Sequence, residues 1–120
     1  MRWALLLLSL GLAPTMAVAQ QNVTAGDGAV LRTLEKISGN VTEFTLVIGE
    51  SFEMGRMTGT LRACRFPPEN PAGEAFAYMT IWEEGGDQPE FDGWMIASSP
   101  ALNALEHPRY DVWVLRCKTD

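Results

Sequence analysis

The chain has 120 residues, of which 47% are hydrophobic, and it carries a formal net charge of −6. A chain of this length supports one domain with one modest core. The acidic balance disfavours nucleic acid as a partner, because neutralisation of phosphates by Lys and Arg supplies most of the affinity for nucleic acid. It equally disfavours binding to an anionic membrane surface.

The first 19 residues have the three parts of a secretory signal peptide. Arg2 precedes an apolar run from Trp3 to Leu12, and Ala17-Val18-Ala19 matches a small-residue cleavage site. The apolar run is shorter than the roughly 18 residues that span a membrane. We therefore expect a signal peptide over 1–19, a secreted, periplasmic mature protein, and no membrane insertion after cleavage.

Export bears on the two cysteines, Cys64 and Cys117. An even number of cysteines in a chain bound for an oxidising compartment favours a disulfide bond over free thiols. Two cysteines and one histidine do not fill a four-ligand structural zinc site without carboxylates. The sequence therefore predicts one disulfide, no metal and no cofactor.

After a polar lead over residues 20–28, which we expect to be flexible, period-two alternation and β-branched residues indicate strands in one domain over 29–120. Turn residues separate the strands, and three prolines mark the segment 67–74 as a loop. The expected strands cover residues 29–34, 41–48, 51–66 with a kink at Gly55-Arg56, 75–82, 91–97 and 111–117.

One short helix is expected over residues 101–105. Ser99 precedes Pro100, which suits the first helical position, and Pro108 disfavours helix at the residue before it. Short strands with Gly and Pro turns are typical of all-β domains. The predicted fold is therefore a small antiparallel β-sandwich or barrel with one short helix and one disulfide.

His107 is the only imidazole and so the only side chain with an ordinary pKa suited to proton transfer near neutrality. Ser98, Ser99 and Asp111 lie near it in sequence, so a serine hydrolase arrangement is conceivable. No Gly-x-Ser-x-Gly motif occurs. A structural reading explains the same residues: the serines begin the helix, His107 ends it, and Asp111 pairs with Arg109 or caps a turn.

Aromatic residues supply the other candidate site. Tryptophan and tyrosine are favoured in cores, in protein interfaces and in sugar-stacking platforms, and the sequence does not separate these roles. With the histidine and arginine beside them, they define a candidate binding surface. Its members are Trp82, Trp94, His107, Arg109, Tyr110 and Trp113.

Three stretches resemble a known family. They are Arg62-Ala63-Cys64-Arg65-Phe66-Pro67-Pro68-Glu69-Asn70-Pro71, Gly93-Trp94-Met95-Ile96-Ala97-Ser98-Ser99-Pro100 and His107-Pro108-Arg109-Tyr110-Asp111-Val112-Trp113. They are similar to a family of small exported bacterial proteins catalogued as a domain of unknown function, over about residues 29–117. The resemblance implies no activity and no catalytic residues. It implies a genomic association with accessory factors of the proton-pumping NADH dehydrogenase.

Three functions follow from these observations. The preferred one is a non-enzymatic periplasmic protein–protein interaction partner, in a specific version an accessory subunit on the periplasmic face of the respiratory NADH dehydrogenase. Its partner is then another envelope or membrane protein, and its oligomeric state is left open. The alternatives are a binding module for envelope polysaccharide or peptidoglycan, and a small hydrolase that uses His107.

Overall fold

The computed structural model describes residue 11 and residues 22–119. The signal peptide expected over 1–19 and its cleavage site lie outside the described residues, apart from Gly11. Within the described part, no helix is long and apolar enough to cross a membrane.

Eight strands account for the regular structure of residues 22–119, and none of these residues is helical. All strand pairs are antiparallel. The strands are β1 (Thr24–Ala25), β2 (Gly28–Glu35), β3 (Val41–Val47), β4 (Ser51–Met54), β5 (Met57–Phe66), β6 (Phe76–Glu83), β7 (Phe91–Ile96) and β8 (Tyr110–Lys118). The all-β prediction is confirmed.

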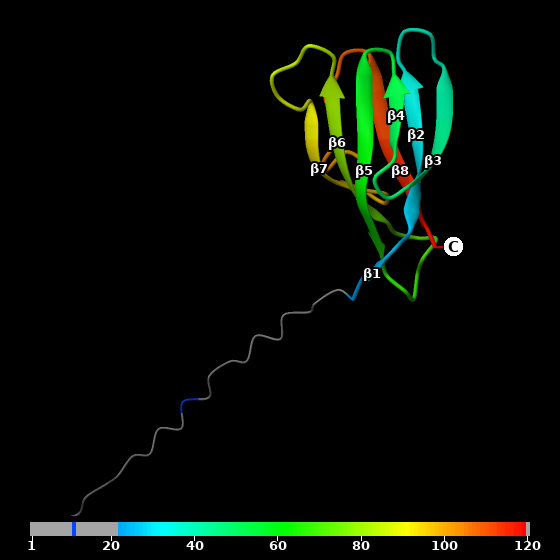
Figure 1. The fold of residues 1–120 in the computed structure, drawn as a ribbon. Coiled ribbons are helices and arrows are strands. Elements are labelled where there is room, and N and C mark those ends of the chain that lie inside the picture. Colours follow the sequence, from blue (N-terminus) through cyan, green and yellow to red (C-terminus); the bar gives the residue numbers. More distant parts are fainter. Residues whose placement is uncertain (1–10, 12–21, 120) are drawn as a thin grey trace, which may run out of the picture.

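The strands form two sheets that pack face to face (Figure 1). The five-stranded sheet has the order β1-β5-β6-β7, and β4 pairs with β5 beside β1. The three-stranded sheet has the order β3-β2-β8. Of the two architectures expected, the structure is the sandwich.

The core lies between the sheets and is built from alternate residues of each strand. Leu31 of the three-stranded sheet and Leu61, Met79 and Ile81 of the five-stranded sheet are completely buried. Cys64 and Cys117 join the two sheets by a disulfide with a Cα–Cα distance of 5.7 Å. The disulfide prediction is confirmed.

Each cysteine reaches the core because its strand contains a β-bulge. The β5–β6 register shifts between Leu61 and Ala63, and the β2–β8 register shifts opposite Leu115. A bulge inserts one residue and so reverses which face the following residues occupy. Strict alternation would place Cys64 and Leu61 on different faces of β5, and Cys117 and Val114 on different faces of β8. In the structure all four residues are buried in the core.

The helix predicted over residues 101–105 is absent. Residues 97–103 form turns, held by Ser99 N donating to Ile96 O and Leu102 N donating to Ser99 O. Leu102, which would have begun an apolar helical face, is 75% exposed. Five residues with no buried stripe do not overcome the cost of helix nucleation.

The lead expected to be flexible over residues 20–28 is hydrogen-bonded from Thr24 onward. β1 pairs with the end of β5, Gly26 N donates to Cys64 O, and Asp27 N donates to Lys118 O. These bonds connect the segment to both cysteine-bearing strands. Sequence polarity alone missed a strand that is held by backbone bonds rather than by apolar burial.

Candidate functional site

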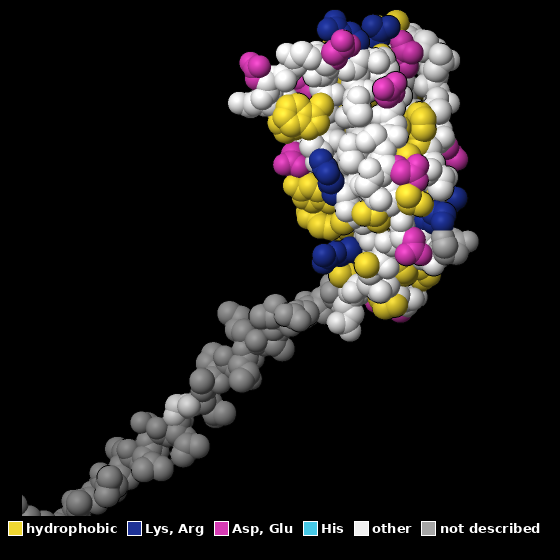
Figure 2. All heavy atoms as spheres, viewed as in Figure 1, with side chains coloured by type: hydrophobic (Ala, Val, Ile, Leu, Met, Phe, Trp, Pro, Cys, Tyr) yellow, Lys and Arg dark blue, Asp and Glu magenta, His cyan; other side chains and the backbone are white. Residues whose placement is uncertain are grey.

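Large aromatic side chains gather on the outer side of the five-stranded sheet, over β6 and β7. We call this surface the outer aromatic face, and it comprises Arg62, Arg65, Phe76, Tyr78, Trp82 and Trp94. Phe76, Tyr78 and Trp82 alternate with the core residues Ala77, Met79 and Ile81 along β6, so they point away from the core. Figure 2 shows hydrophobic side chains gathered there, with Lys or Arg side chains between them.

Cross-strand contacts fix the geometry of this face. Tyr78 and Trp94 are register partners on β6 and β7, and their rings meet edge to face with centroids 5.3 Å apart. The Arg65 guanidinium lies over the Trp94 ring, 5.6 Å from its centroid. Val23, Arg65, Phe76 and Trp94 line a shallow hollow of about 240 Å³. Trp82, at the far end of β6, is 42% exposed.

A polar chain crosses three strands of the same face. Arg62 Nε donates to the Thr80 hydroxyl at 3.4 Å, and that hydroxyl donates to Asp92 at 3.1 Å. A hydrogen bond to the Asp92 carboxylate raises the pKa of Tyr78 above its usual value. Arg62, Thr80 and Asp92 therefore link β5, β6 and β7 across this face.

The structure divides the predicted binding surface into three parts. Trp82 and Trp94 lie on the outer aromatic face. Trp113 is half-buried on the outer side of the other sheet, where its register partner is Arg32. Tyr110 is 8% exposed and belongs to the core. The six residues therefore do not form one surface, and none of the three tryptophans is in the buried core.

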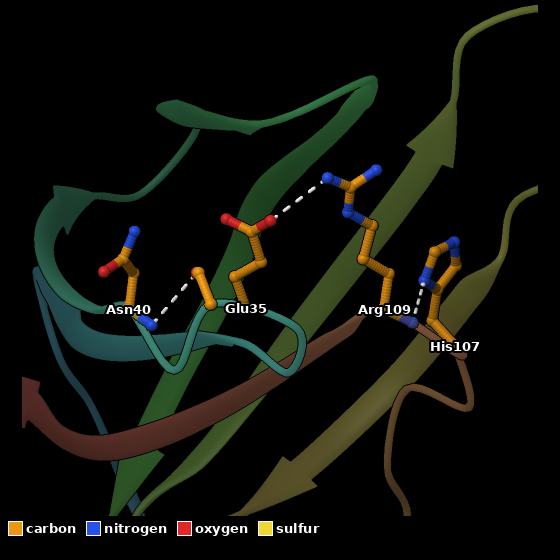
Figure 3. A network of polar contacts seen from close by, with 5 residues as sticks. Glu35, Asn40, His107 and Arg109 are labelled. Carbon is orange, nitrogen blue, oxygen red and sulfur yellow. Dashed lines mark hydrogen bonds and ion pairs between the residues drawn. The ribbon is translucent and has the colours of Figure 1, made fainter.

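His107 and Arg109 lie together at one end of the sandwich, beside the turn that connects β2 and β3 (Figure 3). Arg109 Nη2 donates to Glu35 at 3.1 Å, and its guanidinium lies 5.8 Å from the Tyr110 ring centroid. The Arg109 amide donates to His107 Nδ1 at 3.1 Å. Pairing with Arg109 was one of two roles considered for Asp111, and it is wrong, because Asp111 pairs with Lys36 at 3.3 Å and Arg109 pairs with Glu35.

The described residues do not assemble the triad considered for a hydrolase. His107 Nε2 lies 3.8 Å from Glu83, in a side chain that is 12% exposed. The hydroxyl of Ser98 donates to Glu74 instead of the imidazole. The single histidine thus has a carboxylate beside it but neither of the candidate serines. Within residues 22–119 there is also no group of three or more His, Cys, Asp or Glu that could hold a metal ion.

Glu74 connects the loop before β6 to the turn after β7 through hydrogen bonds. Its Oε1 accepts hydrogen bonds from Ala75 N at 3.0 Å and Ser98 N at 3.1 Å, and its Oε2 accepts from the Ser98 hydroxyl. Partial burial raises the pKa of Glu74, but the hydrogen bonds from Ser98 and Ala75 outweigh this, and the net pKa is lowered. The ionised carboxylate therefore stabilises the fold.

The hydrogen bonds to the Glu74 carboxylate predict a pH-dependent contribution to stability. Because the pKa of Glu74 is lower in the folded state, its stabilisation is present above the unfolded-state pKa and is lost as pH falls through the folded-state value. We expect Glu74→Gln to reduce the free energy of unfolding by about 1 kcal/mol near pH 7, allowing for solvent screening, and by much less near pH 3. Urea titrations at both pH values test this. An equal loss at both would contradict it.

Phe76, Tyr78 and the two arginines of the outer face were not among the residues predicted for binding. The available signal was the alternation in β6, where every second residue is large and aromatic or polar while the others are Ala, Met and Ile. That pattern shows which residues share a face, but it does not say which of two apolar faces meets the core.

The chain belongs to a bacterial family described as "Uncharacterized protein conserved in bacteria (DUF2155)", whose model matches residues 29–117. It is 33% identical over 89 residues to the "Uncharacterized protein RP359" of Rickettsia prowazekii (strain Madrid E). That match covers 70% of this chain and 56% of the relative, so this chain spans little more than half of the relative's length. No solved structure matches.

Proposed function

We propose that the protein is a non-enzymatic periplasmic interaction protein that docks on another envelope protein through the outer aromatic face. The observation that carries this proposal is the exposure of Trp82 and the half-burial of Trp94 on a sheet whose other side already forms the core. Tryptophan, tyrosine and arginine are the residues that most often dominate binding energy in protein interfaces. The disulfide supports an oxidising compartment such as the periplasm.

The charges on this face define the partner's chemistry. At the Trp94 end of the face, Arg62 is linked to Asp92 through Thr80, and Arg65 lies over the Trp94 ring, so two arginines accompany one carboxylate in a chain whose net charge is −6. A partner that presents an acidic residue beside an apolar ridge would neutralise Arg65 and cover the Trp94 ring. The specific version of the proposal is an accessory subunit on the periplasmic face of the respiratory NADH dehydrogenase.

Two observations favour a protein partner over a glycan. A sugar ring stacks on an open aromatic face, but Arg65 already lies over the Trp94 ring, and Tyr78 meets that ring edge to face. Trp82 is separated from them by four positions along β6, so the rings do not form one continuous platform. An arginine stacked on a tryptophan is instead well placed to bind a carboxylate while the ring is buried by apolar groups.

Charge reversal on this face should break the interaction without damaging the fold. We expect Arg65→Glu to reduce co-purification of NADH dehydrogenase subunits with the tagged chain at least about tenfold, the loss typical of a hot spot. The measurement is quantitative mass spectrometry of detergent-solubilised membranes after affinity purification. Arg65 is exposed, so the melting temperature should change little.

Trp94→Ala and Trp113→Ala form a matched pair of controls, since both remove a half-buried tryptophan but from opposite outer faces. Only the first should reduce recovery of the partner. Equal recovery with Arg65→Glu, Trp94→Ala and the unaltered chain would contradict docking through this face. If other envelope proteins are recovered, and their recovery depends on Trp94, the docking face is supported. If no NADH dehydrogenase subunit is among them, that complex is not the partner.

A further inference from the structure

The edge of β3 has no partner strand within the described residues. β3 pairs with β2 through an uninterrupted register from Val47 to Val41, and no strand pairs with its other side. Only Leu46 of its seven residues is buried. β3 is therefore an exposed edge strand, a position that natural sheets usually protect.

The pattern of hydrogen bonds between β2 and β3 shows which backbone groups of β3 point to its open side. Glu35 N donates to Asn40 O and Ile48 N donates to Asp27 O, at the two ends of the β2–β3 ladder. Bonded pairs in an antiparallel ladder recur at every second residue. Residues 42, 44 and 46 therefore bond to β2, while the N–H and C=O groups of Val41, Glu43 and Thr45 point to the open side.

The edge of β3 is protected only at one end, whereas the outer edge of β7 in the other sheet is covered. The outer edge of β7 is covered because Asn103 Nδ2 donates to Trp94 O at 2.8 Å and Ser99 N donates to Ile96 O at 3.2 Å. On β3, Glu50 Oε1 accepts from Val47 N at 3.0 Å. From Val41 to Thr45 there is no proline, lysine or bulge, and Glu43 is the only charged residue among the five.

Apolar side chains gather around the same strand. Seven large hydrophobic residues are exposed in the described part of the chain, and four of them belong to β3 or the turns at its two ends. These four are Ile37, Val41, Val47 and Ile48. On the inner side, a hollow of about 320 Å³ lies between β3 and β4, lined by Thr42, Phe44 and Met54 among others. An added strand would therefore find apolar contacts on both sides.

The charged residues around the β3 edge indicate the net charge of a segment that would bind there. Glu43 lies in the middle of the open segment, and Glu35 and Glu53 line the hollow. Arg32 and Arg109 are already paired with Glu43 and Glu35, at 2.6 and 3.1 Å. The surroundings thus present more carboxylates than cations, in a chain that is acidic overall. A basic segment is the complementary partner.

We propose that β3 accepts an extended basic segment of another polypeptide, which adds as a further strand to the three-stranded sheet. Main-chain bonds to Val41, Glu43 and Thr45 hold the segment. A basic side chain lies opposite Glu43, and the alternate apolar side chains enter the hollow beside Phe44. A second copy fits less well, because a two-fold antiparallel pair centred on Glu43 places two carboxylates opposite each other. This surface is separate from the outer aromatic face and does not depend on it.

The test uses the full mature chain, isotope-labelled for NMR, and a capped peptide of about nine alternating lysine and valine residues. In the proposed geometry, a lysine opposite Glu43 directs its own N–H toward β3. Methylation of the lysine backbone nitrogens should therefore abolish binding, whereas methylation of the valine backbone nitrogens should leave the affinity unchanged. The unmodified peptide should shift and protect the amides of Val41, Glu43 and Thr45 more than those of Thr42 and Phe44.

A charge exchange provides the second arm. Glu43→Lys should weaken binding of the lysine peptide at least about tenfold, and a glutamate-valine peptide should then bind the variant better than the unaltered chain. Equal binding of the two methylated peptides would overturn strand addition and leave only charge attraction. So would a lack of binding up to about 1 mM, or a concentration-dependent dimer that involves the same three amides and excludes the peptide.

Discussion

Replacing Cys64 with serine is expected to lower the free energy of unfolding by about 2–5 kcal/mol. The bond joins residues 53 positions apart, and in the chain-entropy model a loop of that size contributes about 4 kcal/mol by restricting the unfolded chain. Both cysteines are buried, at 1% and 6% exposure, so the serine hydroxyl would also lie in an apolar site. A small domain has about 5–15 kcal/mol in total.

Urea unfolding followed by tryptophan fluorescence measures this loss. Reductant should destabilise the unaltered chain by a similar amount and should leave Cys64→Ser unchanged, which makes the variant its own control. Cys64→Ala separates the loss of the bond from the burial of a hydroxyl. If reductant had no effect on the unaltered chain, the bond would contribute nothing to its stability.

The cysteine pair shows what sequence reasoning reached and where it stopped. The expectation of export and the even cysteine count together predicted the bond correctly, because oxidising compartments favour disulfides. Strict alternation along β5 would place Cys64 on the same face as Thr58, Thr60 and Arg62, away from Leu61. The bulge that moves it to the core depends on how β5 pairs with β6, and no local pattern in the sequence records that pairing.

The strands were predicted closely because their signals are local. All six expected strand segments are present, and the kink expected at Gly55-Arg56 is the turn between β4 and β5. Gly55 has a φ of +60°, which favours glycine, and a Cβ there would lie 2.2 Å from the Tyr110 hydroxyl. β1 was missed because its stability comes from bonds to β5, which is distant in sequence.

The candidate site could not be assembled from the sequence because it depends on which face of each strand meets the core. In β6 the smaller side chains, Ala77, Met79 and Ile81, are buried, and the aromatic residues are outside. Hydrophobicity alone does not decide between these two arrangements, because both sides of the strand are largely apolar. The outcome depends on which side of β6 the other sheet covers, and on that side Ala77, Met79 and Ile81 share one core cluster with Leu31 and Val114.

Leu31 therefore gives the second large effect that we expect. It lies in β2, the central strand of its sheet, between register partners Phe44 and Val114, and it is completely buried. Leu31→Ala removes apolar contacts and leaves a cavity that rigid neighbouring strands cannot fill, so the free energy of unfolding should fall by about 2–5 kcal/mol.

Val41→Ala is the matched control, because Val41 lies on the neighbouring strand of the same sheet but is 57% exposed. Its truncation should change stability by no more than about 0.5 kcal/mol, while reducing binding of a strand that packs against the β3 edge. Urea titrations of the two variants give both values. A loss at Val41 as large as that at Leu31 would mean that β3 is covered in solution, and that its exposed edge is already occupied by another copy of the chain.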